Sequence, residues 1–277
     1  MLIDWHTNLW MPEHFGPEAK ELTGRVSSND GSPQAFERDV LGTADRAVIV
    51  TMNFPKIGLN VPNTFVAEVV AKHKDRVKGL ACVDPMHPNA ERDLEHAIRE
   101  LGLQGLKISP VYGVFDPWCA EAGRLYRLCE RLRVPLLWHQ SAGFASQCAL
   151  DWGRPALLDR IGREFPKLKQ IVAHLGQPWM EEAVVLLRKH PQIYSDLSAR
   201  FHRKWQLYHG LMVAKEYGVT GQLLFGSDFP VRSTAAAAAE FRALNDWGEG
   251  VRMPRFPDET IEEIISGRPW SLIWDGA

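Results

Sequence analysis

The chain has 277 residues, of which 45% are hydrophobic and 24% are charged, with a formal net charge of −2 at pH 7. This composition allows a large buried core. The balanced charge, without a cluster of lysine and arginine, argues against nucleic acid or an anionic membrane as the main partner and leaves a small-molecule substrate.

Cysteine usage and the start of the chain both indicate an intracellular protein. The four cysteines are scattered and form no CxxC pair, which is typical of reduced thiols. The chain begins directly with a strand-like run, and no apolar stretch reaches membrane-spanning length. We therefore predict a cytoplasmic protein without a membrane partner, and leave open whether it forms a homo-oligomer.

Short apolar runs recur along the chain, and each is followed by turn residues and a helix-like pattern. Runs such as "AVIVTM" and "QIVAHLG" are continuously apolar, which is typical of parallel strands covered on both faces. Most of the runs lie roughly 30 residues apart, the spacing of βα units. The predicted strands are residues 2–7, 47–52, 77–84, 105–109, 135–140, 170–174, 193–197 and 222–228.

The segments between these runs carry helical signals. In residues 89–102, Leu94, Ile98 and Leu101 recur at helical spacing, and Gly102 follows the last of them. This spacing places the three apolar side chains on one face of a helix, and glycine commonly ends one. Comparable patterns occur in residues 121–133, 180–191 and 233–244.

Eight strands alternating with helices predict an α/β fold, a (β/α)8 TIM barrel that forms a single domain over residues 1–277. An open doubly wound sheet is the main competitor, but it usually has fewer strands. No GxGxxG or GxxxxGK[ST] motif follows any predicted strand, so nucleotide binding has no support. Residues 12–43, rich in glycine, proline and serine, are predicted as a long loop after the first strand. In a barrel such a loop lies over the active site.

Polar residues with metal-ligating chemistry stand at the ends of four predicted strands. His6, His139 and His174 each end an apolar run, and Asp228 ends the last one. A single histidine in such a place is more often a hydrogen-bonded core residue, but four at one barrel mouth favour a site. Imidazole nitrogen and carboxylate oxygen are the ligands of catalytic Zn²⁺.

Four segments containing these residues resemble the amidohydrolase superfamily. They are "IDWHT", "VPLLWHQS", residues 168–198 and "QLLFGSDFP". The resemblance is to the amidohydrolase-related branch, which includes aminocarboxymuconate-semialdehyde decarboxylase, and it extends to the closing segment "ISGRPWSLIW", expected as a helix.

The resemblance implies a TIM-barrel enzyme with one divalent metal ion, Zn²⁺ being expected and Mn²⁺ the alternative. His6, His139 and Asp228 match the metal ligands of the family. His174 matches the histidine that acts beside the metal as general acid and base, and Asp228 would also take a proton from water. Lys107 stands where other branches bridge two metals, but a two-metal site is not expected here.

One residue departs from the family pattern. Asn8 occupies the place of the second histidine of an HxH motif, and an amide oxygen is a weaker ligand than imidazole. Three outcomes stay open: Asn8 binds the metal through its oxygen, water fills the gap, or the site has lost its metal. A lower-ranked alignment pairs Asp4 with His6 as a carboxylate-x-His motif.

The predicted function is a metal-dependent hydrolase that acts on an ester, lactone or amide of a small carboxylated molecule through a metal-activated water. Lys107 and Arg200 are candidates to hold the substrate carboxylate. The alternative is a non-oxidative, metal-dependent decarboxylase of an aromatic or unsaturated carboxylic acid. A non-catalytic barrel without metal ranks third, because it would have little need for buried polar groups at the mouth.

Overall fold

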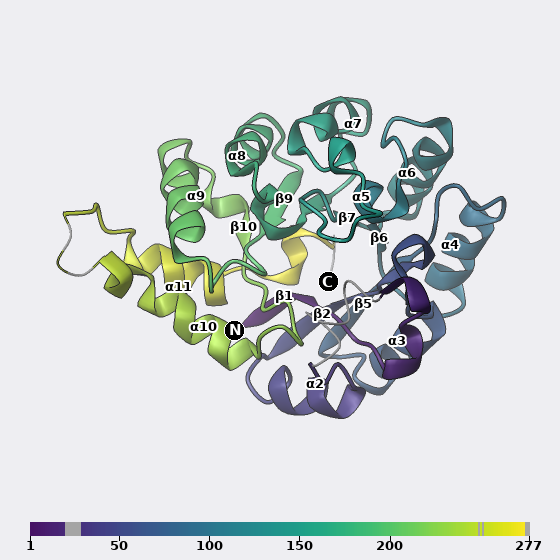
Figure 1. Cartoon of the computed structure of the whole chain (residues 1–277), viewed down its shortest axis with the longest axis horizontal. Coiled ribbons are helices and arrows are strands. Elements are labelled where there is room, and N and C mark those ends of the chain that lie inside the picture. The colour runs from purple at the N-terminus through teal and green to yellow at the C-terminus, as the bar shows by residue number, and fades with distance from the viewer. Residues whose placement is uncertain (20–28, 249, 251, 275–277) are drawn as a thin grey trace.

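Eight parallel strands form a nearly closed barrel, and helices surround it as an outer ring (Figure 1). The computed structural model describes residues 1–19, 29–248, 250 and 252–274. The predicted (β/α)8 barrel is confirmed. In spatial order the strands are β1 (Ile3–Thr7), β2 (Arg46–Val50), β5 (Val77–Cys82), β6 (Leu106–Ile108), β7 (Leu136–Trp138), β8 (Gln170–Val172), β9 (Ile193–Asp196) and β10 (Leu223–Leu224).

The last strand joins the first through an irregular ladder. Residues 222–228 are predicted as one strand, but regular pairing is limited to Leu223–Leu224. Beyond it, Trp5 N donates to Phe225 O at 2.9 Å, and Asp228 N donates to His6 O at 2.9 Å. The pairing is irregular because Asp228 has a φ of 59°, outside the range of a strand.

The helices follow the strands in the alternation that the sequence predicts. The closing segment is an exception, because it forms only a short 3-10 turn, Trp270–Leu272, after the last helix. The helices are α2 (Pro33–Asp39), α3 (Asn63–Lys72), α4 (Ala90–Arg99), α5 (Pro110–Gly113), α6 (Ala120–Leu132), α7 (Leu158–Glu164), α8 (Met180–Lys189), α9 (Lys204–Glu216), α10 (Thr234–Arg242) and α11 (Asp258–Ser266).

The prediction of a continuous loop over residues 12–43 is wrong in its last third. Ser32 caps α2 by accepting a hydrogen bond from Ala35 N, and Pro33 occupies the first turn. Serine is favoured at the position that caps the start of a helix, and proline is favoured in the first turn. Ala35 and Phe36 are buried, so tertiary packing supports a helix that the glycine- and serine-rich composition conceals. Residues 20–28 of the predicted loop lie outside the described residues.

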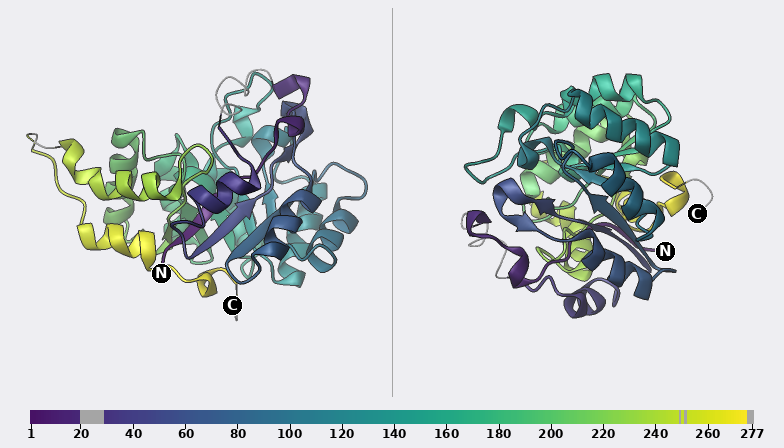
Figure 2. Two further views of the ribbon diagram at one scale, coloured as in Figure 1. Left: turned by 90° about the horizontal axis from the view of Figure 1, so that it is seen from below. Right: turned by 90° about the vertical axis from the view of Figure 1, so that its right-hand side faces the viewer.

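A tryptophan cluster fills the end of the barrel opposite the strand carboxyl ends. Trp5 stacks on Trp274 at a ring-centroid distance of 5.8 Å, and Trp270 lies 6.3 Å from Trp274. Arg46 and Lys78 lie over the Trp270 ring, a favourable cation–π arrangement. The first and last described residues therefore lie on the same side of the molecule (Figure 2).

A short hairpin interrupts the alternation after β2. Strands β3 (Asn53–Phe54) and β4 (Leu59–Asn60) pair antiparallel, with Gly58 at a φ of 73° in the turn. Since left-handed backbone is favourable for glycine, this residue permits the tight reversal.

None of the helices in the described part of the chain has the length and apolar character that a membrane span requires.

Helices α7 and α8 are joined by an ion-pair cluster around Asp159. Lys189 Nζ lies 2.5 Å from the carboxylate, buried His190 Nε2 lies 2.8 Å away, and Arg163 Nε lies 3.3 Å away. Hydrogen bonds from Lys189 and His190 lower the pKa of Asp159 from 3.8 to about 2. Because the folded-state pKa is depressed, the stabilisation is present above pH 4 and is lost as the pH falls toward 2.

We expect Asp159→Asn to lower the free energy of unfolding by about 1 kcal/mol at pH 7, a value discounted because the carboxylate is about one-third exposed. Urea unfolding at pH 7 and pH 3 measures the effect, which should shrink at the lower pH. Asp75→Asn is the control, since Asp75 is exposed and its replacement should change little at either pH. Equal losses for Asp159→Asn at both pH values would contradict the assignment.

Candidate active site

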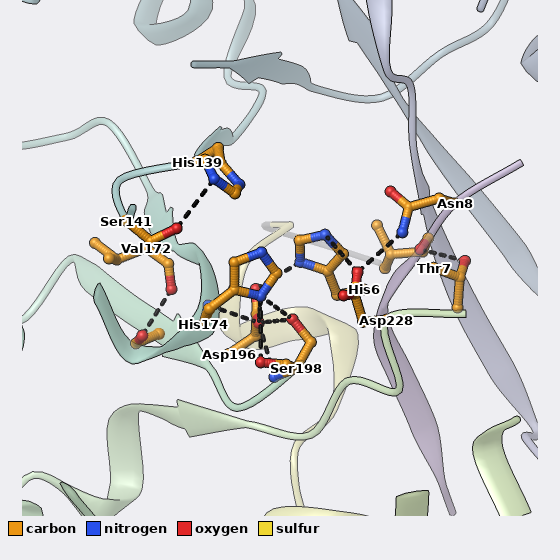
Figure 3. Close-up of polar contacts among 12 residues, drawn as sticks. His6, Thr7, Asn8, His139, Ser141, Val172, His174, Asp196, Ser198 and Asp228 are labelled. Atoms are coloured by element: carbon orange, nitrogen blue, oxygen red, sulfur yellow. Dashed lines mark hydrogen bonds and ion pairs between the residues drawn. The ribbon is translucent and has the colours of Figure 1, made fainter. Parts of the chain in front are cut away.

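The five residues predicted as site residues gather at the carboxyl end of the barrel. His6 and Asn8 lie at the end of β1, His139 follows β7, His174 follows β8, and Asp228 follows β10. All five line one cavity of about 120 Å³, and Figure 3 shows how their side chains lie. The barrel therefore brings together residues that are far apart in the sequence, as expected for this fold.

Three of the five side chains form a compact group of possible ligands. One ligand atom from each of His6, His174 and Asp228 lies within 4.8 Å of the other two. His6 Nε2 lies 3.8 Å from Asp228 Oδ1, and the two imidazole rings have a centroid distance of 4.9 Å (Figure 3). This set contains nitrogen and carboxylate oxygen donors, the ligand types that divalent transition metals take.

His139 lies beside this group but is not part of it. Its ring centroid lies 5.1 Å from that of His174, and its Nε2 lies 3.0 Å from Ser141 Oγ. The His139 ring also stacks on Tyr112 at a centroid distance of 4.2 Å. In the arrangement described, His139 is held by Ser141 and Tyr112, and His174 is the imidazole nearest to His6.

Two of the site residues have strained backbone. His174 has a φ of 58° and Asp228 a φ of 59°, a left-handed conformation that side-chain-bearing residues rarely adopt. The neighbouring structure holds both: His174 N donates to Asp196 Oδ1, and Asp228 N donates to His6 O. Such strain is concentrated at functional sites, and here it occurs where each chain segment turns away from the barrel.

Asp196 is the site residue whose role the sequence did not reveal. It ends β9 and is fully buried. Its carboxylate accepts hydrogen bonds from His6 Nδ1 at 2.9 Å, His174 N at 3.1 Å and Ser198 N at 3.0 Å, and from the Ser198 hydroxyl. The strand-end aspartate of "YSDLS" is visible in the sequence, but His6 lies 190 residues away, so the pairing is not.

Electrostatics favour the ionised form of this carboxylate and the neutral forms of His174 and His139. Burial alone would raise the pKa of Asp196, but the attraction of His6 and the hydrogen bonds outweigh it, so that its pKa lies below 3.8. Burial lowers the pKa of His174 well below 6.5, and His6 adds to the effect. Burial and the charge of Lys107 lower the pKa of His139 in the same direction. Neutral imidazoles have a lone pair available for a metal or a proton.

Asn8 holds Asp228 rather than standing free. Its Nδ2 donates to Asp228 Oδ1 and to Phe229 O, both at 3.0 Å. Burial raises the pKa of Asp228, whereas His6 and the Asn8 hydrogen bond oppose this. Asn8 Oδ1 is buried and has no hydrogen-bond partner among the described residues, so one oxygen acceptor at the cavity stays unused. Together with the compact group, this unused acceptor fits a site for one divalent cation.

Two buried cations were predicted as contacts for a substrate carboxylate, and only one of them lines the cavity. Lys107 is fully buried, lies on the cavity wall, and its Nζ has no hydrogen-bond partner in the described part of the chain. Burial lowers its pKa to about 8, so it stays mostly protonated at pH 7. Arg200 is also buried, but it donates to Gln206 and is not among the cavity-lining residues.

The remaining wall of the cavity is apolar and comes largely from loops. Phe15 and Leu59 form an isolated antiparallel bridge, and Gly16 N donates to Gly58 O at 2.8 Å, so the segment after β1 is joined to the β3–β4 hairpin. This part of the predicted loop therefore reaches the site. The apolar and aromatic lining residues are Trp10, Phe15, Met52, Ile57, Leu59, Tyr112 and Val231.

Asp4 stabilises the barrel and does not line the cavity. Its carboxylate accepts hydrogen bonds from Ser227 N at 2.9 Å and from Thr234 Oγ1 at 2.6 Å. It therefore anchors the segment that carries Asp228. The alternative pairing of Asp4 with His6 as site residues has no support in this arrangement, because Asp4 is not a member of the compact group.

A family model described as amidohydrolase matches residues 3–265. The chain belongs to the amidohydrolase family. Its fold is similar to that of an Acinetobacter baumannii protein assigned as a 2-pyrone-4,6-dicarboxylic acid hydrolase, with citric acid bound. The two chains share 17% identity, with 98% of each chain covered and a TM-score of 0.70.

Two decarboxylases have the same fold as this amidohydrolase. The 5-carboxyvanillate decarboxylase of Sphingomonas paucimobilis is 15% identical, covers 98% of both chains and has a TM-score of 0.64. A dihydroxybenzoic acid decarboxylase of a Polaromonas species, with bound manganese and an inhibitor, is 17% identical over 98% of this chain and 96% of its own, with a TM-score of 0.66. At such identities the likeness shows the fold and leaves the reaction open.

The backbone of this amidohydrolase leaves no room beside His6. A Cβ placed on Gly226 would lie 2.9 Å from His6 Cβ and 3.2 Å from Ser198 Cβ. We expect Gly226→Ala to lower the free energy of unfolding by about 1–3 kcal/mol, because neither neighbour can move without disturbing the site. Gly221→Ala is the matched control, since a Cβ there meets nothing within 4 Å. Urea unfolding measures the free energy of unfolding of both variants. Equal values would show that the packing around Gly226 is looser than described.

Proposed function

We propose that this amidohydrolase is a metal-dependent hydrolase that acts on an ester, lactone or amide of a small carboxylated molecule. The observation that carries the proposal is the compact group of His6, His174 and Asp228, whose ligand atoms lie within 4.8 Å of one another in a cavity at the carboxyl end of the barrel. Membership of the amidohydrolase family supports the reaction class, and one protein with this fold is assigned as a probable 2-pyrone-4,6-dicarboxylic acid hydrolase.

We propose that His6 and Asp228 hold one divalent ion, with Zn²⁺ expected and Mn²⁺ as the alternative. When bound, such an ion supplies a Lewis acid and lowers the pKa of water toward neutrality. The third ligand is His139 by resemblance to the family, or His174 by proximity in the described arrangement. The spare oxygen of Asn8 is available as a further, weaker ligand.

Residues of the chain itself carry out the proton transfers and bind the substrate. Asp228, whose pKa is raised by burial, accepts the proton of the attacking water. If His139 takes the third ligand position, the neutral His174 accepts this proton from Asp228 and then passes it to the leaving group. Lys107 attracts the substrate carboxylate, and the apolar wall excludes water from the rest of the molecule.

The aromatic part of the cavity favours a second candidate function, a non-oxidative decarboxylase. Trp10, Phe15 and Tyr112 line the same cavity as the polar group, and a planar ring fits such aromatic side chains. Two proteins with this fold act on hydroxylated aromatic acids, as their names state. A non-catalytic barrel stays the third alternative. The single domain over 1–277 and the cytoplasmic location stay predictions, and whether the chain forms a homo-oligomer stays open.

Metal content is the first test. We expect about one equivalent of Zn or Mn in protein purified without added ions, measured by elemental analysis, and its loss in His6→Ala. His139→Ala and His174→Ala then separate the two assignments of the third ligand, because only the true ligand should cost most of the metal. Asn8→His should raise metal affinity by supplying a stronger ligand.

Parent protein without metal, combined with metal uptake by Asn8→His, would mean that Asn8 abolished the site, and the hydrolase proposal would fail. Metal in the parent that survives replacement of His6 would place the ion elsewhere and overturn the ligand assignment.

The role of Lys107 is tested with substrates that differ in one charge. We expect Lys107→Met to raise KM at least tenfold for carboxylated lactones and esters, because the substrate loses a buried ionic partner. Uncharged esters of the same acids should be affected little. Activity is measured by pH-stat titration for hydrolysis and by CO₂ release from dihydroxybenzoates, so the same panel separates the two candidate reactions. Equal effects on charged and uncharged esters would rule out the carboxylate contact.

A further inference from the structure

We infer that Asp196 and Ser198 form a positioning pair that fixes the protonation pattern of two imidazoles in the cavity. The pair places a proton on Nδ1 of both His6 and His174, so that both Nε2 atoms face the cavity. Free neutral histidine in water favours the opposite tautomer, with the proton on Nε2. The protein must therefore impose this arrangement, and the hydrogen bonds around Asp196 show how.

The first step concerns the carboxylate. An ionised carboxylate only accepts hydrogen bonds, and Asp196 is buried with four donors directed at it. One of the four is His6 Nδ1, 2.9 Å from Asp196 Oδ2. Because the carboxylate cannot donate, His6 must carry its proton on Nδ1. In the neutral ring, Nε2 then has a free lone pair.

The second step concerns the Ser198 hydroxyl, which has a single proton. It donates that proton to Asp196 Oδ1, and it also lies 2.7 Å from His174 Nδ1. Since its proton is already used, the hydroxyl can only accept from His174. The Ser198 carbonyl oxygen, 3.2 Å from the same nitrogen, is likewise an acceptor. His174 must therefore carry its proton on Nδ1 as well.

The consequence is that one carboxylate orients two imidazoles from different parts of the chain. His6 lies on β1 and His174 follows β8, yet both hold Nδ1 against the Asp196–Ser198 pair while their rings line the cavity (Figure 3). In the free protein, His174 is thus a ligand or a proton acceptor, and it can donate a proton only after it has received one. Carboxylates that orient metal-binding histidines in this way typically affect affinity by 10- to 100-fold.

The tautomers are a property of the metal-free protein, so this part of the inference does not rest on the proposed hydrolase activity. Only the consequence of these tautomers for metal binding rests on the proposed hydrolase activity. The test is a long-range ¹H–¹⁵N correlation spectrum of the metal-free protein with ¹⁵N-labelled histidine at pH 8. His6→Asn and His174→Asn assign the two signals. His96, which is exposed, reports the pattern of a free ring in the same sample.

We expect Nδ1 of both His6 and His174 to be protonated, whereas His96 shows the mixture typical of free histidine. An unprotonated Nδ1 on either residue would overturn the inference. Ser198→Ala should shift the His174 signal toward the free pattern and leave that of His6 unchanged, and Ser198→Thr should restore it. An unchanged His174 signal in Ser198→Ala would contradict the role of the hydroxyl.

Asp196→Asn tests the other member of the pair. Both signals should move, because the amide can donate where the carboxylate could only accept, and Zn²⁺ affinity measured by calorimetry should fall 10- to 100-fold. If this variant does not fold, the parent spectrum and the spectra of the Ser198 variants still test the inference. Correct tautomers in a parent that binds no Zn²⁺ would leave the positioning pair intact and count only against the proposed function.

Discussion

The contact between β1 and the segment after β10 is the constraint on which both the barrel and the cavity depend. Asp228 N donates to His6 O, and Asn8 N donates to Phe229 O at 2.8 Å. These hydrogen bonds close the barrel, and the same residues supply three of the five predicted site side chains. Closure of the sheet and assembly of the site are therefore one event, because His6 and Asp228 cannot lie side by side in an open sheet.

Burying so many polar groups at one end of the barrel is costly unless each is bonded. Asp196 meets this requirement with donors from three residues, and Asp228 is held by Asn8. Lys107 Nζ and Asn8 Oδ1 are the exceptions within the cavity among the described residues. Polar atoms left without partners in an otherwise satisfied site are best explained by a ligand that completes them.

Much of the fold was predictable because the signals for it are local. Continuous apolar runs identify buried parallel strands, and their carboxyl ends indicate where His6, His139, His174 and Asp228 meet. The partners of Asp196 and the resting position of His139 were not predictable, because they depend on side chains that approach only after closure. Helix α2 was missed for a different reason: its burial, rather than its composition, makes it helical.

Four of the apolar residues that line the cavity come from the segment after β1 and the β3–β4 hairpin, which touch each other through the Phe15–Leu59 bridge. Neither element contributes to the barrel ladder. An insertion, deletion or exchange in these two loops would therefore reshape the pocket without moving the strand-borne polar groups. Evolution can alter substrate choice in such a protein independently of its chemistry, and the same separation offers a route for redesigning its specificity.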